Sequence, residues 1–122
     1  YTYEDNKYII FPAPSIDDLK KEGLQQGNCV GSMYLQPYIN SKTEIFFMRD
    51  IEKVDKSLIT LEFKNGHIVQ KELPHHSQKF TEEQNTFINN WVNFRQFMDQ
   101  KEKYKKKQEI KVIKYNFKNM VA

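Results

Sequence analysis

The chain has 122 residues, 39% hydrophobic and 14% aromatic, which is enough for one hydrophobic core and too little for two. Its nine Phe, seven Tyr and one Trp exclude an intrinsically disordered chain. No apolar run reaches the roughly 20 residues that span a bilayer, and a single cysteine excludes an internal disulfide framework. We therefore expect a single domain, residues 1–122, that is soluble and cytoplasmic and has no membrane partner.

The formal net charge of +3 is unevenly distributed. Residues 101–122 hold eight lysines against Glu102 and Glu109, a net charge of +6, which leaves residues 1–100 at −3. Such a segment attracts phosphates or an acidic protein surface. The alternative is a solvated helix end that keeps the domain soluble. The first residue is Tyr, which suggests a piece of a longer protein.

The N-terminal part predicts a strand and a helix. Residues 8–11 form an apolar, β-prone run that ends at two prolines. Ser15 and Asp18 have the spacing of a capped helix start, because the Ser oxygen can accept a hydrogen bond from a free backbone N–H. A short helix over about 15–25 is expected.

A second short helix is predicted after Asn28, which is a good N-cap residue and places Cys29 in the first turn. Apolar residues then recur at helical spacing as far as Tyr34. Pro37 lacks the N–H that would continue the helix, so the helix should end or kink there.

Three strands are predicted at 43–49, 57–64 and 67–73. Asn65-Gly66 between the last two is typical of a two-residue type I′ turn, which needs positive φ at both positions. This turn would pair Lys64 with His67 and, by strict alternation, Leu61 with Gln70. The prediction places Gln70 among the apolar side chains of one sheet face and Glu62 on the other face.

A long helix is predicted over about 81–105. Thr81 and Gln84 form a capping box, and apolar residues including Trp91 follow at helical spacing. We interpret this stripe as a core face, because a small sheet needs one face covered. The alternation in residues 110–117 favours an added edge strand. The fold class is therefore α+β, with an antiparallel sheet of three to five strands, two short N-terminal helices and one long helix.

Cys29 is the candidate nucleophile. A thiol in the first turn of a helix lies at the positive end of the dipole, which lowers its pKa. His67 is the candidate general base. The alternative is a buried, unreactive cysteine. Glu62 and Gln70 lie within apolar strands, where they form either structural hydrogen bonds or one side of a polar pocket.

Other chemistries find little support in the residues. His75 and His76 are adjacent, and neighbouring side chains in an extended chain point to opposite sides, so we predict no metal site. The chain has no P-loop, dinucleotide-binding, nucleophile-elbow or zincin motif. No cofactor is expected.

The segment from Pro14 to Gln70 resembles the C-terminal domain of PcfJ-like proteins, a family of conjugative plasmids, phages and related mobile elements. The matching pieces, in order, are Leu19-Lys20-Lys21-Glu22-Gly23, Asn28-Cys29-Val30-Gly31-Ser32 with Tyr34, Ile45-Phe46-Phe47-Met48-Arg49, Ile59-Thr60-Leu61-Glu62 and Ile68-Val69-Gln70.

The resemblance implies a mobile-element context and directs attention to Cys29, Tyr34, Glu62 and Gln70, but it implies no established reaction. The family usually has His directly before the Cys, where this chain has Asn28. It also continues past the Gln with Gly and Asn, which this chain lacks.

The leading hypothesis is a non-enzymatic interaction module of a phage or plasmid accessory protein that binds a protein or nucleic acid, partly through its basic C-terminal segment. The candidate binding residues are Asn28, Tyr34, Glu62, Gln70, Lys103, Lys105, Lys106 and Lys107. Two alternatives stay open: a cysteine-dependent hydrolase or transferase using Cys29 and His67, and an inhibitor of a host defence system.

Overall fold

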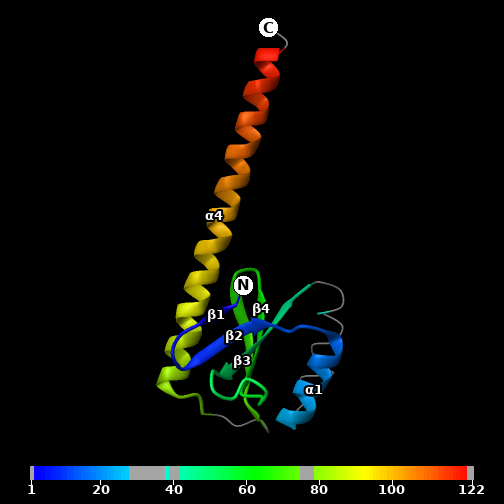
Figure 1. Ribbon diagram of the computed structural model, residues 1–122, viewed down its shortest axis with the longest axis vertical. Coiled ribbons are helices and arrows are strands. Elements are labelled where there is room, and N and C mark those ends of the chain that lie inside the picture. The colour runs from blue at the N-terminus through cyan, green and yellow to red at the C-terminus, as the bar shows by residue number, and fades with distance from the viewer. Residues whose placement is uncertain (1, 28–37, 39–41, 75–78, 121–122) are drawn as a thin grey trace. The chain divides into compact units, whose positions relative to one another are not determined.

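The computed structural model describes residues 2–27, 38, 42–74 and 79–120 (Figure 1). The elements are β1 (Tyr3–Glu4), β2 (Tyr8–Pro12), α1 (Ile16–Gln26), β3 (Glu44–Asp50), β4 (Ile59–Lys64), β5 (His67–Glu72) and α4 (Glu82–Met120). The predicted α+β class is confirmed, with five strands and two helices in the described part of the chain. The second short helix expected after Asn28 lies outside the described residues.

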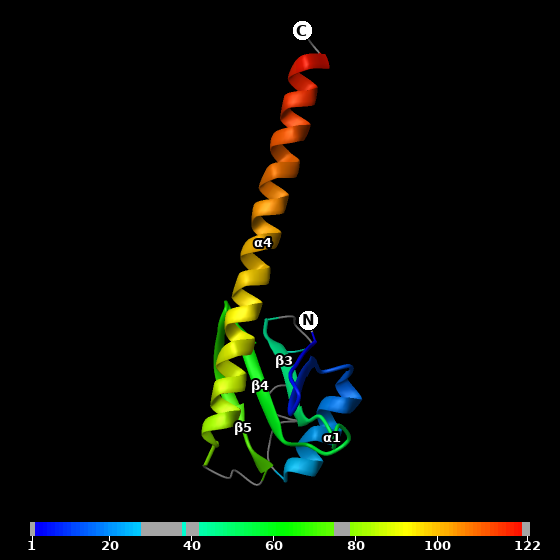
Figure 2. The same cartoon turned by 60° about the vertical axis from the view of Figure 1, so that its left-hand side comes forward.

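The five strands form one antiparallel sheet in chain order, β1-β2-β3-β4-β5. Each strand after β1 pairs with the strand that precedes it in the sequence. Three of the four connections are short, whereas β2 and β3 are joined by residues 13–43, which include α1. Figure 2 shows β3, β4 and β5 side by side. In the centre of the sheet, Phe46 on β3 lies opposite Leu61 on β4, and Phe47 lies opposite Thr60.

Both faces of the sheet are covered. Alternate residues of β3 point to opposite faces, and all five residues from Ile45 to Arg49 are buried. On one face, Phe46 and Met48 join the large core with the first turns of α4. The opposite face holds a smaller cluster, Ala13, Leu19, Ile45 and Phe47, to which α1 contributes Leu19. The sheet is therefore the central layer of residues 1–92.

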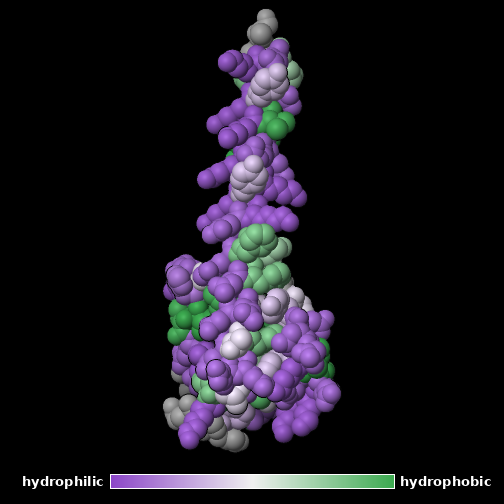
Figure 3. Space-filling view, turned by 90° about the vertical axis from the view of Figure 1, so that its left-hand side faces the viewer, coloured by the Kyte–Doolittle hydropathy of each residue, from purple (hydrophilic) through white to green (hydrophobic). Residues whose placement is uncertain are grey.

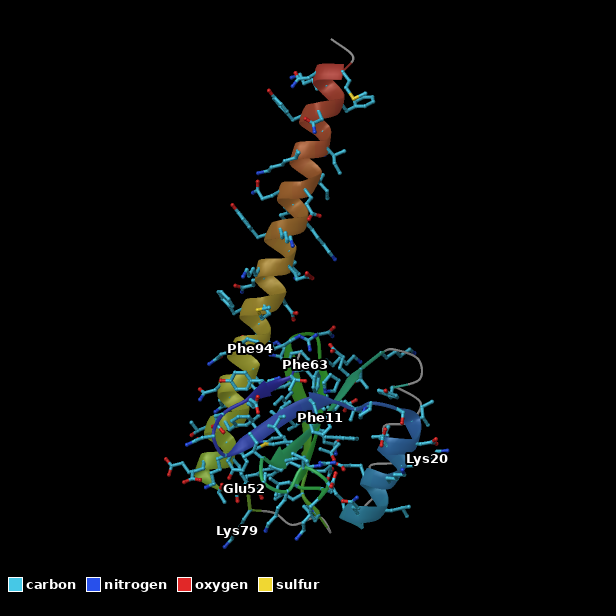
Figure 4. All side chains as sticks on the ribbon, in the orientation of Figure 1. Phe11, Lys20, Glu52, Phe63, Lys79 and Phe94 are labelled. Carbon is cyan, nitrogen blue, oxygen red and sulfur yellow. The ribbon has the colours of Figure 1, made fainter. Side chains whose placement is uncertain are left out.

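Trp91 is the largest side chain of the core and is fully buried. Its ring centroid lies 4.6 Å from that of Phe46 and 5.2 Å from that of Phe63, both in edge-to-face geometry (Phe63 is labelled in Figure 4). The predicted role of Trp91 as a core residue is confirmed. Its indole Nε1 is buried without a hydrogen-bond acceptor among the described residues.

Two of the three predicted helix starts, at Ser15 and Thr81, are confirmed by hydrogen bonds. The Ser15 Oγ accepts from the backbone N of Asp18 at 3.1 Å. At α4, the Thr81 Oγ1 accepts from the N of Gln84 at 3.1 Å, and the Gln84 Oε1 accepts from the N of Thr81 at 2.9 Å. Helix α1 ends at Gly27, whose φ of 61° lies in the left-handed region.

A polar contact joins the start of α4 to the turn between β1 and β2. Lys7 donates a hydrogen bond from its Nζ to the carboxylate of Glu83. This bond raises the pKa of Lys7. The same turn is closed by Asp5, whose carboxylate accepts from the backbone N of Lys7 and of Tyr8 at 2.8 Å each.

The Asn65-Gly66 hairpin has the predicted turn and a different register. Both turn residues have positive φ, 54° and 82°, and Lys64 lies opposite His67. Beyond Phe63 the register shifts, so Glu62 lies opposite Gln70. The prediction that Gln70 faces Leu61 is therefore wrong. Val69 is an extra residue in β5, and such a bulge breaks the alternation on which the prediction depended.

Helix α4 continues to Met120, so the predicted end near 105 and the predicted strand at 110–117 are both wrong. Residues 79–120 contain neither Gly nor Pro, and a helix already formed continues by adding one hydrogen bond per residue. That gain overrides the β propensity of residues such as Ile110 and Val112.

The chain forms two compact units, residues 1–92 and residues 93–122. The lysine-rich segment 101–122 belongs to the second unit. Within the described ranges, no helix is both long and apolar enough to cross a bilayer.

Candidate functional site

Helix α1 turns two polar side chains toward the sheet. Its buried residues are Leu19, Glu22, Gly23 and Gln26, which recur at i, i+3, i+4 and i+7 and so share one face. In Figure 4, by contrast, Lys20 points away from the sheet. Because Glu22 and Gln26 occupy positions where an apolar residue is usual, they require polar partners on the sheet.

Arg49 of β3 is the partner of Glu22. It is only 5% exposed and donates from Nη1 to Glu22 Oε2 at 2.9 Å and from Nη2 to Glu22 Oε1 at 2.5 Å. Its Nε donates to the carbonyl of Val54 at 3.2 Å. The guanidinium carbon also lies 4.9 Å from the ring centroid of Phe47 and 5.8 Å from that of Phe11. This two-point geometry fixes the orientation of both side chains.

Thr60 of β4 connects the remaining polar groups. Its Oγ1 donates to Glu22 Oε2 at 2.8 Å and accepts from Gln26 Nε2 at 2.9 Å. We name these four buried residues, Glu22, Gln26, Arg49 and Thr60, the α1-sheet polar cluster. Both oxygens of the Glu22 carboxylate accept hydrogen bonds within it. The cluster thus holds α1 in register on β3 and β4.

A shallow pocket of about 300 Å³ borders this cluster. It is lined by Phe11, Pro14, Asp18, Lys21, Glu22, Gln25, Phe47, Arg49, Val54 and Asp55. Nearby, the side chain of Gln25 accepts a hydrogen bond from the backbone N of Ser57 at 2.8 Å, which ties α1 to the segment between β3 and β4. Of the groups that line the pocket, the Glu22 carboxylate, the Arg49 guanidinium and the Val54 carbonyl already bind one another.

Among the predicted site residues, the structure brings Glu62 and Gln70 together. They lie opposite each other on β4 and β5, both half-buried. Gln70 Nε2 donates to Glu72 Oε1 at 2.7 Å. His67, the predicted general base, is exposed at the first position of β5.

The site residues predicted around Cys29 are not among the residues that the structure describes. Asn28, Cys29 and Tyr34 lie outside the described residues. The His75-His76 pair, where no metal site is predicted, lies outside them as well. The pairing of Cys29 with His67 therefore stays a prediction. In the described part of the chain, no three His, Cys, Asp or Glu side chains are grouped so that they could hold a metal ion.

The lysine-rich segment is helical, and this determines which lysines act together. Five exposed lysines follow one another at intervals of three or four residues and therefore share one side of α4. We name this set the lysine face: Lys103, Lys107, Lys111, Lys114 and Lys118. Glu102 and Glu109 are seven residues apart and fall on the opposite side. Figure 3 shows mostly hydrophilic side chains along this segment, interrupted by separate hydrophobic patches.

Only two of the four lysines that the sequence predicted for binding lie on the lysine face. Lys103 and Lys107 belong to the lysine face. Lys105 and Lys106 are each followed three or four residues later by residues outside the lysine face, so they project in other directions.

The α1-sheet polar cluster was not predicted from the sequence, although one signal for it was present. Glu22 and Gln26 are spaced three and seven residues from Leu19, so they fall on the helix face that an apolar residue marks as buried. A charged residue at such a position indicates a buried partner. Nothing in the sequence identified Arg49, 27 residues away, as that partner.

Comparisons with known proteins agree with the resemblance. The profile of the PcfJ-like protein family matches residues 1–88. A Listeria innocua serovar 6a protein, named Uncharacterized protein Lin1253/Lin1744, is 41% identical over 89 residues, 72% of this chain and 19% of that protein. The chain thus spans about a fifth of the length of this relative. No solved structure gives a significant match. The match over residues 1–88 places the chain in the PcfJ-like protein family.

Proposed function

We propose that this chain is a non-enzymatic interaction module of a phage or plasmid accessory protein, and that the lysine face of α4 binds its partner, a nucleic acid or an acidic protein. The observation that carries the proposal is the alignment of Lys103, Lys107, Lys111, Lys114 and Lys118 on one side of a helix. An aligned row of cations produces a stronger local potential than the same charges spread around the helix.

The distribution of acidic residues supports this reading. Residues 101–122 contain only two carboxylates, Glu102 and Glu109, and both fall on the side opposite the lysine face. The lysines are thus not neutralised by acidic neighbours along the same face. Binding through them should release counterions from a polyanion, so its affinity should fall steeply with salt.

The α1-sheet polar cluster, within the described residues of the first unit, supports the non-enzymatic part of the proposal. The α1-sheet polar cluster uses its carboxylate and guanidinium groups to bind one another. A general base would instead need a lone pair directed at a substrate. In this reading, residues 1–92 supply a stable scaffold, and the second unit supplies the binding surface.

The test compares two lysine pairs of equal charge and spacing in the intact chain. Lys107→Gln/Lys111→Gln removes two charges from the lysine face, and Lys101→Gln/Lys105→Gln removes two from another side of the same helix. Fluorescence anisotropy follows binding of labelled single-stranded DNA, duplex DNA and polyglutamate across a salt series.

The first pair should weaken binding more than the second and reduce the slope of log affinity against log salt by about 1.4 for a single strand. Equal losses from both pairs would show that the alignment of the lysines does not matter. The proposal fails if the unaltered chain binds none of the three polyanions at low salt.

A further inference from the structure

Two tyrosines lie among the lysines of α4. Tyr104, Lys107, Lys111, Tyr115 and Lys118 follow at intervals of three, four, four and three residues, so they share one side of the helix. Tyr104 is 66% exposed and Tyr115 is 67% exposed. The lysine face is therefore bordered by aromatic rings that are open to a partner.

We propose that the side of α4 formed by these two tyrosines and three lysines binds single-stranded nucleic acid. Tyr104 and Tyr115 would stack on bases, and the lysines between them would contact phosphates. The inference rests on the proposed function and narrows its partner to one class. Single-strand-binding surfaces combine these two features: cations that follow the backbone, and aromatic rings that accept any base, since every base has a π-face.

The spacing of the tyrosines fits two separate stacking positions. Tyr115 is eleven positions after Tyr104 in the helix, a rise of about 16.5 Å at 1.5 Å per residue. One base cannot reach both rings, so each ring would contact a different nucleotide. Lys107 and Lys111 lie between them along the helix, where the intervening phosphates would pass.

The tyrosines favour a single strand over the other polyanions. In a duplex the bases stack on each other inside the helix, so an exposed phenol ring finds no base face. An acidic protein surface is complementary to the lysines alone and gives the rings no comparable partner. Only an unpaired strand offers both a phosphate backbone and accessible base faces.

The experiment uses the intact chain and labelled probes of about 20 nucleotides: a mixed-sequence single strand and its duplex, with polyglutamate as the acidic polypeptide. Tyr104→Leu/Tyr115→Leu removes both rings and keeps apolar, helix-forming side chains. Tyr104→Phe/Tyr115→Phe keeps the rings and removes the hydroxyls. Phe117→Leu is the control, because Phe117 is an exposed aromatic residue on the opposite side of the helix from Tyr104 and Tyr115.

The double Leu variant should bind the single strand about 100-fold more weakly, roughly tenfold for each ring, and the duplex with unchanged affinity. The Phe variant and Phe117→Leu should stay within about threefold of the unaltered chain. Equal helical circular dichroism in all variants would show that the difference does not come from unfolding.

Three outcomes would overturn the inference. One is single-strand binding that the double Leu variant leaves unchanged while Lys107→Gln/Lys111→Gln weakens it, a result that retains the proposed function. A second is polyglutamate or duplex binding as tight as single-strand binding at the same salt, which would assign a different partner class. The third is binding to none of the probes, in which case the proposed function fails as well.

Discussion

A buried ion pair of the first unit and the lysines of the second unit lie in opposite environments. In residues 1–92, Arg49 and Glu22 are buried, and each binds the other at two points. In residues 93–122, every described lysine is exposed on a single helix. The buried Arg49–Glu22 pair therefore determines how α1 lies on the sheet, whereas the exposed lysines of α4 are available to a partner. These charged groups have different roles because their solvation differs.

This comparison is tested most strongly by removing the largest core side chain. Trp91→Ala should lower the free energy of unfolding by about 3–5 kcal/mol, because Phe46 and Phe63 lose their common packing partner. Urea denaturation followed by circular dichroism measures the change. Phe97→Ala, an exposed aromatic residue of the second unit, is the control and should change stability by less than about 0.5 kcal/mol. Similar losses for both variants would contradict the division into two units.

The next effect concerns the α1-sheet polar cluster. Glu22→Gln leaves the Arg49 guanidinium buried without its negative partner, so unfolding free energy should fall by about 3 kcal/mol. The paired replacement Glu22→Leu/Arg49→Met should cost less than the sum of its single changes, because it leaves no unpaired charge. A loss under about 1 kcal/mol for Glu22→Gln would show that the ion pair does not stabilise the packing of α1.

A smaller effect is expected at the hairpin. Gly66 has a φ of 82°, and an added Cβ would meet no atom within 4 Å, so Gly66→Ala carries a conformational cost alone. We expect a loss of about 1 kcal/mol in chemical denaturation. Gly66→Asn should lose less, because Asn tolerates the left-handed region. Equal stability of the Ala variant and the unaltered chain would rule out a strained backbone at this turn.

The smallest effect on global unfolding is expected from a helix breaker in the second unit. Ile113→Pro should reduce the helical signal in far-UV circular dichroism, since proline removes a backbone donor and clashes with the preceding turn. The unfolding midpoint reported by Trp91 fluorescence should stay the same. An unchanged helical signal would instead favour the strand that the sequence predicted for residues 110–117.

Local signals in the sequence predicted the parts of the fold that depend on neighbouring residues. Ser15 and Thr81 cap their helices as expected, and Asn65-Gly66 forms the expected turn. In each case the deciding contact joins residues no more than three positions apart. The α1-sheet polar cluster joins residues 27 to 38 positions apart, and no local pattern specifies such a pairing.

The wrong predictions share one cause: each extrapolated a two-residue alternation along the chain. Strict alternation from the hairpin turn placed Gln70 beside Leu61, and one extra residue in β5 moved it beside Glu62. Likewise, the alternation of residues 110–117 indicated a strand, although the chain from Thr81 onward has no residue that would end a helix. In β5 the bulge shifted the alternation, and in residues 110–117 the helix already formed before them continued.

The extra residue in β5 also bears on how the protein avoids unwanted assembly. Among the described residues β5 is the last strand of the sheet, so one row of its backbone groups faces away from β4. An open strand edge is a template for pairing with another chain, and bulges and lysines are the usual means of blocking it. β5 has both, a bulge at Val69 and an exposed Lys71. A regular strand in its place would expose a straighter edge, and a variant lacking Val69 should aggregate more readily through strand addition.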